Sequence, residues 1–465
     1  AANGIKVHIF DELEPTPVLS FAVRSLHCQA GIMITASHNP AKYNGYKCYG
    51  ADGCQMTDAD ANAVTAYIRK VEIFDGVKVA DYSEAVRDGR IQMIGPELLE
   101  DFLQHVAGEQ LRPGICHEVP LSVVYTPLNG TGNKPVREML HRIGVSALAV
   151  VPEQEKPDGN FPTAPYPNPE IRQAFACALK LAETVKPDLL LATDPDCDRV
   201  GIAVLDSGDY TLMTGNEVGC LLLNYVLTTR AELGTLPEHP VTVKTIVTSD
   251  LVLRIAEKFG CEVREVLTGF KYIGEQIGLL EKEGHPERYV FGFEESYGYL
   301  SGTYVRDKDG VNASMLICEM AAYYKKQGKS LLDVLDALYA EFGVYRHILI
   351  NAEFEGAEGM ATMHKLMESL RENRPQEIAG LAVTRFSDYL ASRSVDMRTG
   401  AETVLTLPKS NVLVFGLEDG AGVIVRPSGT EPKIKAYVTA TGTDKAAAEA
   451  MAERLTDAAK ELLKA

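Results

Sequence analysis

The sequence lacks the signals of a membrane or secreted protein. No apolar run approaches the roughly 20 residues that a membrane-spanning helix needs. A signal peptide is missing as well, and the chain opens Ala1-Ala2-Asn3-Gly4 without an initiator methionine. These absences predict a protein with no membrane partner, and the opening residues suggest a start that has been processed or cut.

The nine cysteines lack the repeated CxxC spacing of a zinc site, and the closest pair in the sequence is Cys48 and Cys54. An odd, scattered set of cysteines is typical of reduced thiols in a protein core rather than of a disulfide framework. A structural zinc site is a weaker alternative. The cysteine pattern therefore predicts a cytoplasmic protein.

Positive charge is also scarce. The chain has 46 Lys and Arg residues against 64 Asp and Glu residues, which gives a formal net charge of −18. A balance this acidic argues against nucleic acid or an anionic membrane as a partner. A small phosphorylated metabolite is still compatible, provided that a few cations gather locally at its site.

Short apolar runs alternate with segments of helical periodicity over most of the chain, which predicts α/β layers around mostly parallel sheets. The expected strands are Ile5–Phe10, Gly31–Thr35, Ser122–Tyr125, Leu189–Thr193, Val200–Leu205, Val241–Val247 and Tyr289–Phe293. The expected helices are Thr57–Lys70, Asn133–Ile143, Asn168–Val185, Asn216–Thr229, Asp250–Phe259 and Asn312–Gln327.

After about Val344 the pattern changes to strands in succession, closed by an amphipathic helix from Thr443 to Leu463. This predicts a separate α+β domain. The expected strands are His347–Glu353, Ala382–Tyr389, Val412–Leu417, Gly422–Val425 and Lys433–Thr439.

The first chemical motif is Thr35-Ala-Ser37-His38-Asn-Pro, which follows an expected strand and precedes Lys47 by a short loop. A serine can carry a phosphoryl group when a base or a cation lies beside it, and Lys47 and His38 are the candidates. Taken alone, the motif is equally compatible with an ordinary turn, because Asn-Pro and Asn-Gly pairs are frequent in turns.

The second motif is Asp194-Pro-Asp196-Cys-Asp198-Arg199, between two apolar strands. Three closely spaced carboxylates repel one another unless a cation compensates them, so the motif predicts a Mg²⁺ site. An EF-hand is excluded, because its Gly and Glu positions are taken by Arg199 and Leu205. Arg199 is a candidate clamp for a phosphate.

Two further loops carry polar groups that suit a sugar phosphate. Gly292-Phe-Glu294-Glu295-Ser296 offers acceptors for sugar hydroxyls, although a solvated turn would explain the bare pattern equally well. Arg426-Pro-Ser428-Gly429-Thr430 offers a bidentate guanidinium, two hydroxyls and a glycine whose backbone an anion can approach. A polar hairpin connection is the alternative for this last loop.

The four motifs, in this order and over nearly the whole chain, resemble the α-D-phosphohexomutase superfamily of phosphoglucomutases and phosphomannomutases. The similarity is greatest to the branch that contains phosphoglucomutase/phosphopentomutase and glucose-1,6-bisphosphate synthase enzymes. It implies a phosphoserine at Ser37, one Mg²⁺ per active site held by Ser37 and by Asp194, Asp196 and Asp198, and substrate contacts from Glu294, Ser296, Lys271, Arg426, Ser428, Gly429 and Thr430.

The resemblance also implies the architecture: three α/β domains and a smaller TATA-box-binding-protein-like fourth domain around a central cleft. With the linkers expected near Arg112–Pro120, Gly234–Pro240 and Gly343, the domains are predicted at 1–115, 116–234, 235–344 and 345–465. The family's first domain normally begins earlier, so the sheet under Ser37 is expected to be incomplete at its N-terminal side. Ile5–Phe10 would then keep an unpaired apolar edge.

The implied activity is an intramolecular phosphoryl transfer between hexose 1-phosphate and hexose 6-phosphate, most simply of glucose, through phosphorylated Ser37 and glucose 1,6-bisphosphate. Lys47 is the candidate general acid/base, which would require a depressed pKa, Arg199 would neutralise charge, and His38 would pack behind the loop. Oligomeric state is left open.

Several alternatives remain open at this point. The specificity could be that of a phosphopentomutase or a phosphomannomutase. The chain could be a fragment with weak or no activity, or a sugar-phosphate-binding protein without catalysis. Leu189–Asp198 also has a superficial similarity to the nucleophile motif of haloacid-dehalogenase-type phosphatases, but Asp198 stands where that motif has Thr or Val.

Overall fold

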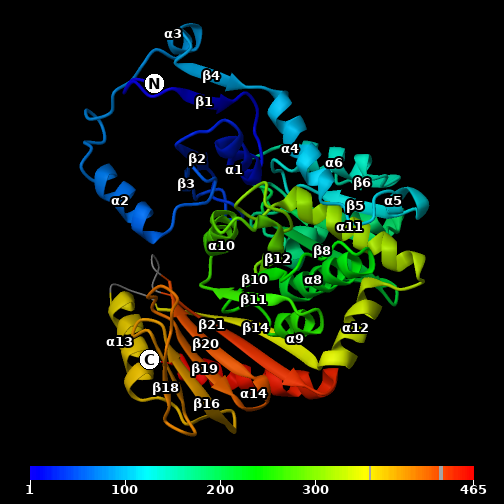
Figure 1. Cartoon of the computed structure of the whole chain (residues 1–465), viewed down its shortest axis with the longest axis vertical. Helices are drawn as coiled ribbons and strands as arrows, with labels where there is room; N and C mark the ends of the chain where they lie inside the picture. The colour runs from blue at the N-terminus through cyan, green and yellow to red at the C-terminus, as the bar shows by residue number, and fades with distance from the viewer. Residues whose placement is uncertain (355–357, 429–432, 465) are drawn as a thin grey trace. The chain divides into compact units, whose positions relative to one another are not determined.

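The computed structural model describes residues 1–354, 358–428 and 433–464, and the chain divides into two compact units. Unit 1 comprises Ala1–Thr245 and Ala256–Leu332, and unit 2 comprises Ile246–Ile255 and Asp333–Ala465. Figure 1 shows the elements of both units coloured along the chain.

The elements of unit 1 follow the predicted alternation of strands and helices. They are β1 (Val7–Phe10), α1 (Thr16–Ser25), β2 (Ala30–Ile34), β3 (Tyr46–Gly50), α2 (Asp58–Ile68), α3 (Tyr82–Arg87), β4 (Ile91–Ile94), α4 (Pro96–Gly108), α5 (Ile115–Glu118), β5 (Ser122–Thr126), α6 (Asn133–Arg142), β6 (Ala147–Val150), α7 (Ala176–Val185), β7 (Leu189–Thr193), β8 (Val200–Asp206), β9 (Asp209–Met213), α8 (Gly215–Glu232), β10 (Val241–Thr245), β11 (Glu262–Val266), α10 (Phe270–Lys282), β12 (Tyr289–Glu294), β13 (Gly298–Leu300) and α11 (Gly310–Lys326). The helices α9 (Leu251–Lys258) and α12 (Leu331–Phe342) each contain a boundary between the units.

The first part of unit 1 contains two separate strand pairs rather than one sheet. β2 and β3 form an antiparallel hairpin in which Met33 lies opposite Lys47, so the serine loop is the connection at the end of this hairpin. Helix α1 packs on the hairpin closely, because a Cβ added at Gly31 would lie only 2.5 Å from Val23 Cγ2. The hairpin therefore brings Lys47 back beside the serine loop, as the sequence predicts.

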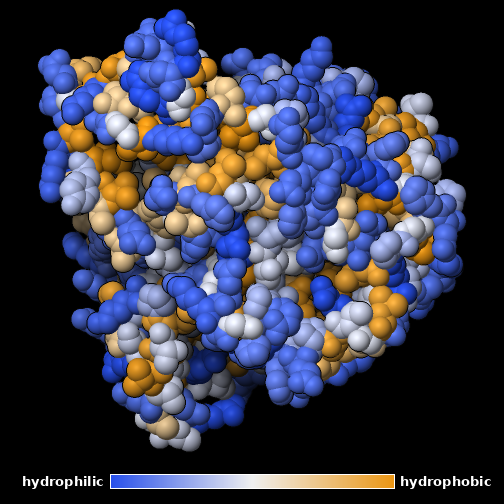
Figure 2. Space-filling model, turned by 45° about the horizontal axis from the view of Figure 1, so that its top comes forward, coloured by the Kyte–Doolittle hydropathy of each residue, from blue (hydrophilic) through white to orange (hydrophobic). Residues whose placement is uncertain are grey.

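The other pair consists of β1 and β4, which run parallel. Among the described residues β1 has no strand partner besides β4. Ile9 within β1 and Ile5 just before it are exposed, so the predicted apolar edge is present. Figure 2 shows apolar residues, in orange, at several places on the surface of the molecule. Ile32 and Ile34 of β2 are exposed as well.

The second sheet has the strand order β6-β5-β7-β8-β9 and holds the aspartate loop at the end of β7. β5 pairs in parallel with β6 and β7, but β7, β8 and β9 run antiparallel. The expectation of mostly parallel strands is therefore wrong for this half of the sheet. A short loop joins β7 to β8, whereas a parallel pair needs a crossover of roughly a dozen residues or more.

One predicted helix is also corrected. The segment expected to be helical from Asn168 begins its α-helix, α7, only at Ala176, after a short 3₁₀ turn at Arg172–Phe175. The Asn168 side chain accepts a hydrogen bond from the backbone N–H of Glu170 at 3.0 Å, and this local turn replaces the first helical turn.

The third sheet has the order β11-β10-β12-β13, with β10 parallel to both of its neighbours and β13 antiparallel to β12. Helix α8 packs directly on β12, where a Cβ at Gly219 would lie 2.1 Å from the Phe293 ring. This sheet carries Glu294 at the end of β12, at the point where the chain turns back into β13.

Unit 2 is built on one antiparallel sheet of order β14-β21-β20-β19-β16-β17-β18, with β15 beside β16. Its elements are β14 (Val344–Glu353), α13 (Gly359–Glu372), β15 (Glu377–Ile378), β16 (Leu381–Asp388), β17 (Arg393–Asp396), β18 (Glu402–Val404), β19 (Leu413–Leu417), β20 (Gly422–Pro427), β21 (Lys433–Gly442) and α14 (Lys445–Leu462). Side chains of α13, α14 and the sheet share one apolar core. The predicted C-terminal α+β domain is confirmed.

In the described part of the chain we find no helix that has both the length and the apolar character needed to cross a membrane. The bounds predicted for the four domains and the central cleft remain predictions.

Candidate functional site

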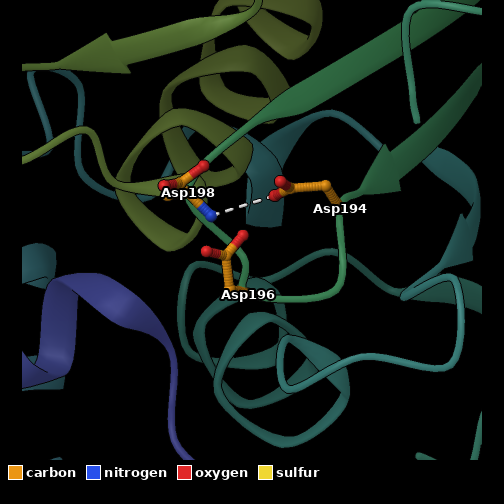
Figure 3. A group of neighbouring side chains, drawn as sticks. All are labelled: Asp194, Asp196 and Asp198. Carbon is orange, nitrogen blue, oxygen red and sulfur yellow. Dashed lines mark hydrogen bonds between the residues drawn. The ribbon is translucent and has the colours of Figure 1, made fainter. Parts of the chain in front are cut away.

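The three aspartates after β7 converge on one point. Asp194, Asp196 and Asp198 are all buried, and one ligand oxygen from each lies within 4.8 Å of the others. The loop is folded by its own backbone, because Asp194 Oδ1 accepts hydrogen bonds from the N–H groups of Asp198 at 3.1 Å and Arg199 at 3.0 Å. Figure 3 shows the three carboxylates turned towards a common space, with the Asp194–Asp198 hydrogen bond dashed.

Two lysines neutralise part of this charge. Lys47 Nζ lies 2.8 Å from Asp196 Oδ2 and 3.1 Å from Asp198 Oδ2. Lys308 Nζ lies 2.8 Å from the same Asp198 Oδ2 and 3.3 Å from Asp307 Oδ1. The local cluster of cations that an acidic protein needs for a phosphorylated ligand is therefore present at the carboxylates.

The pKa values of the carboxylates diverge for physical reasons. Burial, followed by the charges of Asp196 and Asp198, holds the pKa of Asp194 well above its ordinary value. Burial also acts to raise the pKa of the other two. At Asp196 the charges of Lys47 and Lys308, together with hydrogen bonds from Asp194 and Lys47, outweigh burial and lower the pKa. At Asp198 the charges of Lys308, Lys47 and Arg199 together outweigh burial and the charge of Asp196, and the pKa is lowered as well. Asp196 and Asp198 therefore differ from Asp194 through the lysines that contact them.

The three aspartates fit a Mg²⁺ ion. Asp196 Oδ1 and Asp198 Oδ1 are buried, and neither accepts a hydrogen bond from any residue that the structure describes. Buried carboxylate oxygens without a donor carry a high cost unless a cation meets them. Mg²⁺ prefers hard oxygen ligands of this kind and leaves positions for phosphate oxygens.

Ser37 lies at this cluster. Its Oγ donates a hydrogen bond to Asp194 Oδ2 at 3.0 Å and lies 3.1 Å from His38 Nδ1. The backbone of Ser37 has a φ of 53°, a left-handed conformation that a non-glycine residue seldom adopts. The hydrogen bond from its N–H to Thr35 Oγ1 at 2.8 Å stabilises this conformation, which turns the hydroxyl towards the aspartates.

His38 is the neighbour of Ser37 both in sequence and in space. Burial first, and then the positive charge of Arg199, lowers the pKa of His38 to about 3. The imidazole is therefore neutral at physiological pH and can accept or donate a hydrogen bond at Ser37 Oγ. The sequence offered His38 both as a candidate base beside Ser37 and as a residue that packs behind the loop, and its Nδ1 lies in contact with the Ser37 hydroxyl.

The expectation of a depressed pKa for Lys47 is wrong for this arrangement of side chains. Burial alone lowers the pKa of Lys47, but the carboxylates of Asp196 and Asp198 outweigh burial and hold it well above its ordinary value. Lys47 is thus an ammonium group in direct contact with two of the candidate metal ligands.

Arg199 is fixed by contacts on both sides of its guanidinium. Its Nη1 donates to Glu170 Oε1 at 2.8 Å and to the backbone carbonyl of Ser296 at 3.1 Å, and its Nε lies 3.8 Å from Asp198 Oδ1. Burial lowers the pKa of Arg199, but the carboxylates around it, Asp198 foremost, raise it further. Arg199 therefore joins the aspartate loop to the loop that contains Ser296.

Glu294 is buried at the end of β12, and its Oε1 accepts a hydrogen bond from the backbone N–H of Gly269 at 2.9 Å. Burial raises its pKa, and burial together with the charge of Glu294 raises the pKa of Glu295 to about 7. Lys271, two residues after Gly269, pairs with Asp58 of α2 at 2.5 Å. Glu294 thus lies at the N-terminal end of α10, whose first turn carries Lys271. The substrate contacts assigned to Glu294, Ser296 and Lys271 remain predictions.

The predicted phosphate loop belongs to unit 2. Arg426 lies near the end of β20, opposite Lys435 of β21, and the backbone N–H of Ser428 donates to the Lys433 carbonyl at 2.7 Å. Gly429 and Thr430 lie outside the described residues. The phosphate-binding role of these four residues therefore stays a prediction.

Four residues at the site were missed from the sequence. Thr16 and Thr35 both donate to Asp196 Oδ2, at 3.1 and 3.3 Å, while Glu170 holds Arg199 and Lys308 contacts Asp198. Single threonines and a lone glutamate give no signal in a sequence. Lys308 is marked by a sequence signal, because it belongs to the charged run Arg306-Asp-Lys-Asp309, which directly precedes the buried helix α11.

Comparison with known families finds four matches in chain order. They are phosphoglucomutase/phosphomannomutase alpha/beta/alpha domain I at residues 1–73, domain II at 100–208 and domain III at 214–342, and the phosphoglucomutase/phosphomannomutase C-terminal domain at 349–458. Together these matches cover most of the chain.

Curated relatives agree with the family matches. Phosphoglucomutases of the Staphylococcus aureus strains bovine RF122 / ET3-1 and USA300 are each 39% identical over 440 residues. The alignments cover 94% of this chain and 77% of each relative.

Solved structures share the fold at lower identity. The open form of the Paramecium phosphoglucomutase parafusin has a TM-score of 0.70 at 19% identity, covering 99% of this chain and 82% of that one. A phosphoglucomutase/phosphomannomutase family protein from Burkholderia thailandensis has a TM-score of 0.61 at 17% identity, with 97% and 81% covered. The Aspergillus fumigatus N-acetylphosphoglucosamine mutase, in complex with GlcNAc-6P and magnesium, has a TM-score of 0.51 at 14% identity, with 97% and 93% covered.

Proposed function

Because the chain belongs to the phosphoglucomutase/phosphomannomutase family, we propose that it interconverts glucose 1-phosphate and glucose 6-phosphate. The proposed route has a phosphoserine at Ser37 and glucose 1,6-bisphosphate as the intermediate. The curated relatives that carry the name phosphoglucomutase support glucose as the sugar.

The observation that carries this proposal is the position of Ser37. Its Oγ lies 3.0 Å from Asp194 Oδ2, although the two residues are 157 positions apart in the sequence. The fold therefore brings the serine loop to the aspartate cluster. Phosphoryl transfer depends mainly on alignment and on charge neutralisation, and cations surround this hydroxyl's acidic neighbours. A phosphoryl group on Ser37 would lie among Lys47, Lys308 and Arg199.

The proposed reaction has two transfers. In the first, the bond between phosphorus and Ser37 Oγ breaks as the sugar's free hydroxyl oxygen bonds to phosphorus; the sugar hydroxyl loses its proton to a base and Ser37 Oγ takes up a proton. The bisphosphate then turns over, and its other phosphoryl group bonds to Ser37 Oγ, which loses its proton to a base while the sugar oxygen left behind takes up a proton. The net change is the position of one phosphate.

Lys47 is our candidate for the proton transfers. As an ammonium it is suited to give a proton to the oxygen that the phosphoryl group leaves, and to lower the charge of the transferred group. Action as a base would require its ion pairs with Asp196 and Asp198 to break first. Lys308, with a similar ion pair to Asp198, is a second cation for the same charge.

We propose that Asp194, Asp196, Asp198 and the Ser37 oxygen hold one Mg²⁺ ion. When bound, Mg²⁺ would supply Lewis-acid neutralisation of the phosphoryl oxygens. The donor-free oxygens of Asp196 and Asp198 support this assignment.

The remaining roles extend the proposal to the substrate. Glu294 and Ser296 would bind sugar hydroxyls, and Lys271 would contact the sugar or a phosphate. Arg199 would orient the phosphoryl group. In unit 2 we assign the phosphate that does not react to Arg426, Ser428, Gly429 and Thr430.

The test is a mutase assay on the purified chain with Mg²⁺ and a catalytic amount of glucose 1,6-bisphosphate. We expect glucose 6-phosphate to form from glucose 1-phosphate, and intact-mass analysis to find one phosphoryl group, located on Ser37. Parallel reactions with mannose 1-phosphate and ribose 1-phosphate distinguish glucose specificity from the phosphomannomutase and phosphopentomutase alternatives.

Other outcomes would contradict the proposal. Net release of inorganic phosphate would point to a phosphatase, and binding of glucose 1-phosphate without turnover would point to a sugar-phosphate-binding protein.

We also propose a cytoplasmic location, because all nine cysteines are free thiols in the structure.

A further inference from the structure

Tyr49 and Asp307 form a buried hydrogen bond that neither the aspartate cluster nor the serine loop explains. Tyr49 lies on β3 with no exposed surface, and Asp307 lies in the loop before α11, also buried. The Tyr49 hydroxyl donates to Asp307 Oδ2 at 2.7 Å across 258 positions of the sequence. Burying a carboxylate is costly, so this contact needs an explanation beyond packing.

Strand β3 places Tyr49 on the same side as Lys47. Side chains two positions apart on a strand point to one face, and Lys47 reaches Asp196 and Asp198 from that face. The strand next to the serine loop therefore makes two contacts, one with the aspartate cluster and one with the loop that carries Lys308.

The Asp307 carboxylate contacts both Tyr49 and Lys308. While Oδ2 accepts from Tyr49, Oδ1 accepts from the backbone N–H of Lys308 at 2.9 Å and from Lys308 Nζ at 3.3 Å. The same ammonium lies 2.8 Å from Asp198 Oδ2. Because its two oxygens are engaged in different directions, the Asp307 carboxylate can adopt only one orientation, and Lys308 Nζ lies between it and Asp198.

The rest of the loop is held tightly. The side-chain stem of Lys308 passes Gly298, where a Cβ would lie 2.4 Å from Lys308 Cδ. On one side of Asp307, the Arg306 backbone N–H donates to Ser20 Oγ of α1 at 2.9 Å. On the other side, Asp309 caps α11 by accepting from the N–H groups of Val311 and Asn312.

We propose that Tyr49 is a positioning residue, which acts through Asp307 to hold the Lys308 ammonium against Asp198. The serine hairpin and the loop before α11 would then present their two lysines to the aspartate cluster together. The kinetic consequence rests on the proposed mutase function, while the position of Lys308 can be measured independently of it.

The test uses Tyr49→Phe, which removes only the hydroxyl. We expect kcat to fall about tenfold, with the KM for glucose 1-phosphate and the Mg²⁺ dependence unchanged. Asp307→Asn should lower kcat in the same way. In the double variant kcat should fall no further than in the more impaired single variant, because both substitutions break the same connection from Tyr49 through Asp307 to Lys308. Tyr225→Phe is the matched control, since Tyr225 donates to another buried carboxylate, Glu319 Oε1, at 2.8 Å.

A second readout does not depend on turnover. The rate of reductive methylation of Lys308, measured by peptide mass spectrometry, should rise in Tyr49→Phe and stay at the wild-type rate in Tyr225→Phe. An unchanged Lys308 rate, or an equal kcat loss in both tyrosine variants, would overturn the inference. If the wild-type chain has no mutase activity, the proposed function fails, and the Lys308 methylation rate alone decides whether Tyr49 positions it.

Discussion

Ser37 Oγ and Asp194 Oδ2 lie 3.0 Å apart, although Ser37 follows β2 and Asp194 follows β7, which are strands of different sheets in unit 1. The contact joins the end of the β2–β3 hairpin to the end of β7. Thr16 and Thr35 strengthen the same junction by donating to Asp196. Hydroxyls from the first part of the chain thus fix the carboxylates that we assign to Mg²⁺, and the phosphoryl carrier and the metal ligands form one assembly.

The first prediction concerns Ser37. Ser37→Ala should lower kcat by a factor on the order of 10⁴ or more, since no other group would take its place as the phosphoryl carrier. The measurement is glucose 6-phosphate formation with a catalytic amount of glucose 1,6-bisphosphate. Ser25→Ala, an exposed position at the end of α1, is the control and should retain wild-type turnover. Near-normal rates in Ser37→Ala would refute the phosphoserine assignment.

The second prediction concerns the candidate metal ligands. Asp196→Asn should weaken Mg²⁺ binding by at least about 100-fold, because it removes a charge and disturbs a ligand set that neighbouring hydroxyls hold in place. Titration of Mg²⁺ by calorimetry measures this directly, with Asp209→Asn on the exposed end of β9 as the control. Equal Mg²⁺ affinity in wild type and Asp196→Asn would place the ion elsewhere.

The fold could be predicted from the sequence where one element follows a single strong pattern. β7 coincides with the predicted strand Leu189–Thr193. Its short apolar run directly precedes the aspartate motif, and all five of its residues are buried, as the run predicts. β3 was missed, because Tyr46–Gly50 has no clear alternation and its pairing depends on the β2 strand opposite it. The direction of β8 was missed as well, since strand direction follows from loop length and neighbours rather than from the residues of the strand.

At the site, the sequence identified the groups that perform chemistry but not those that hold them. Ser37, Lys47 and the three aspartates lie together as predicted. Glu170 and Lys308 reach the cluster through the packing of distant segments. A lone glutamate gives no signal in a sequence, and the charged run Arg306–Asp309 marks Lys308 without showing what it contacts. The direction in which the pKa of Lys47 is shifted could not be predicted either. Burial lowers this pKa and the nearby carboxylates raise it, and only the structure shows which effect is larger.

The third prediction is a dependence of stability on pH through His38. Its pKa falls from an unfolded value of 6.5 to about 3 on folding, so the folded chain binds this proton less tightly than the unfolded chain does. The stability that depends on neutral His38 is therefore complete above pH 6.5 and is lost progressively as the pH falls towards 3. Between about pH 7.5 and about pH 5.5 the loss should be about 1 kcal/mol.

Urea unfolding at the two pH values measures this loss. His38→Asn should lose about 1 kcal/mol less than the wild type over the same interval, because its side chain does not titrate. His141→Asn, an exposed histidine of α6, is the control and should follow the wild type. Identical pH dependence in His38→Asn and wild type would show that His38 is not held neutral by the fold.

The fourth prediction separates a structural from a substrate role for Lys271. Its ion pair with Asp58 joins the first turn of α10 to the start of α2, and the Asp58 side chain is 67% exposed. Such a pair contributes at most about 1 kcal/mol, so Lys271→Ala and Asp58→Ala should lower stability equally and slightly. If Lys271 also contacts the substrate, the KM for glucose 1-phosphate should rise about tenfold in Lys271→Ala alone, because a charge-assisted hydrogen bond is lost. Equal KM values in the two variants would restrict Lys271 to its ion pair, since both variants lose that pair and only one loses the ammonium.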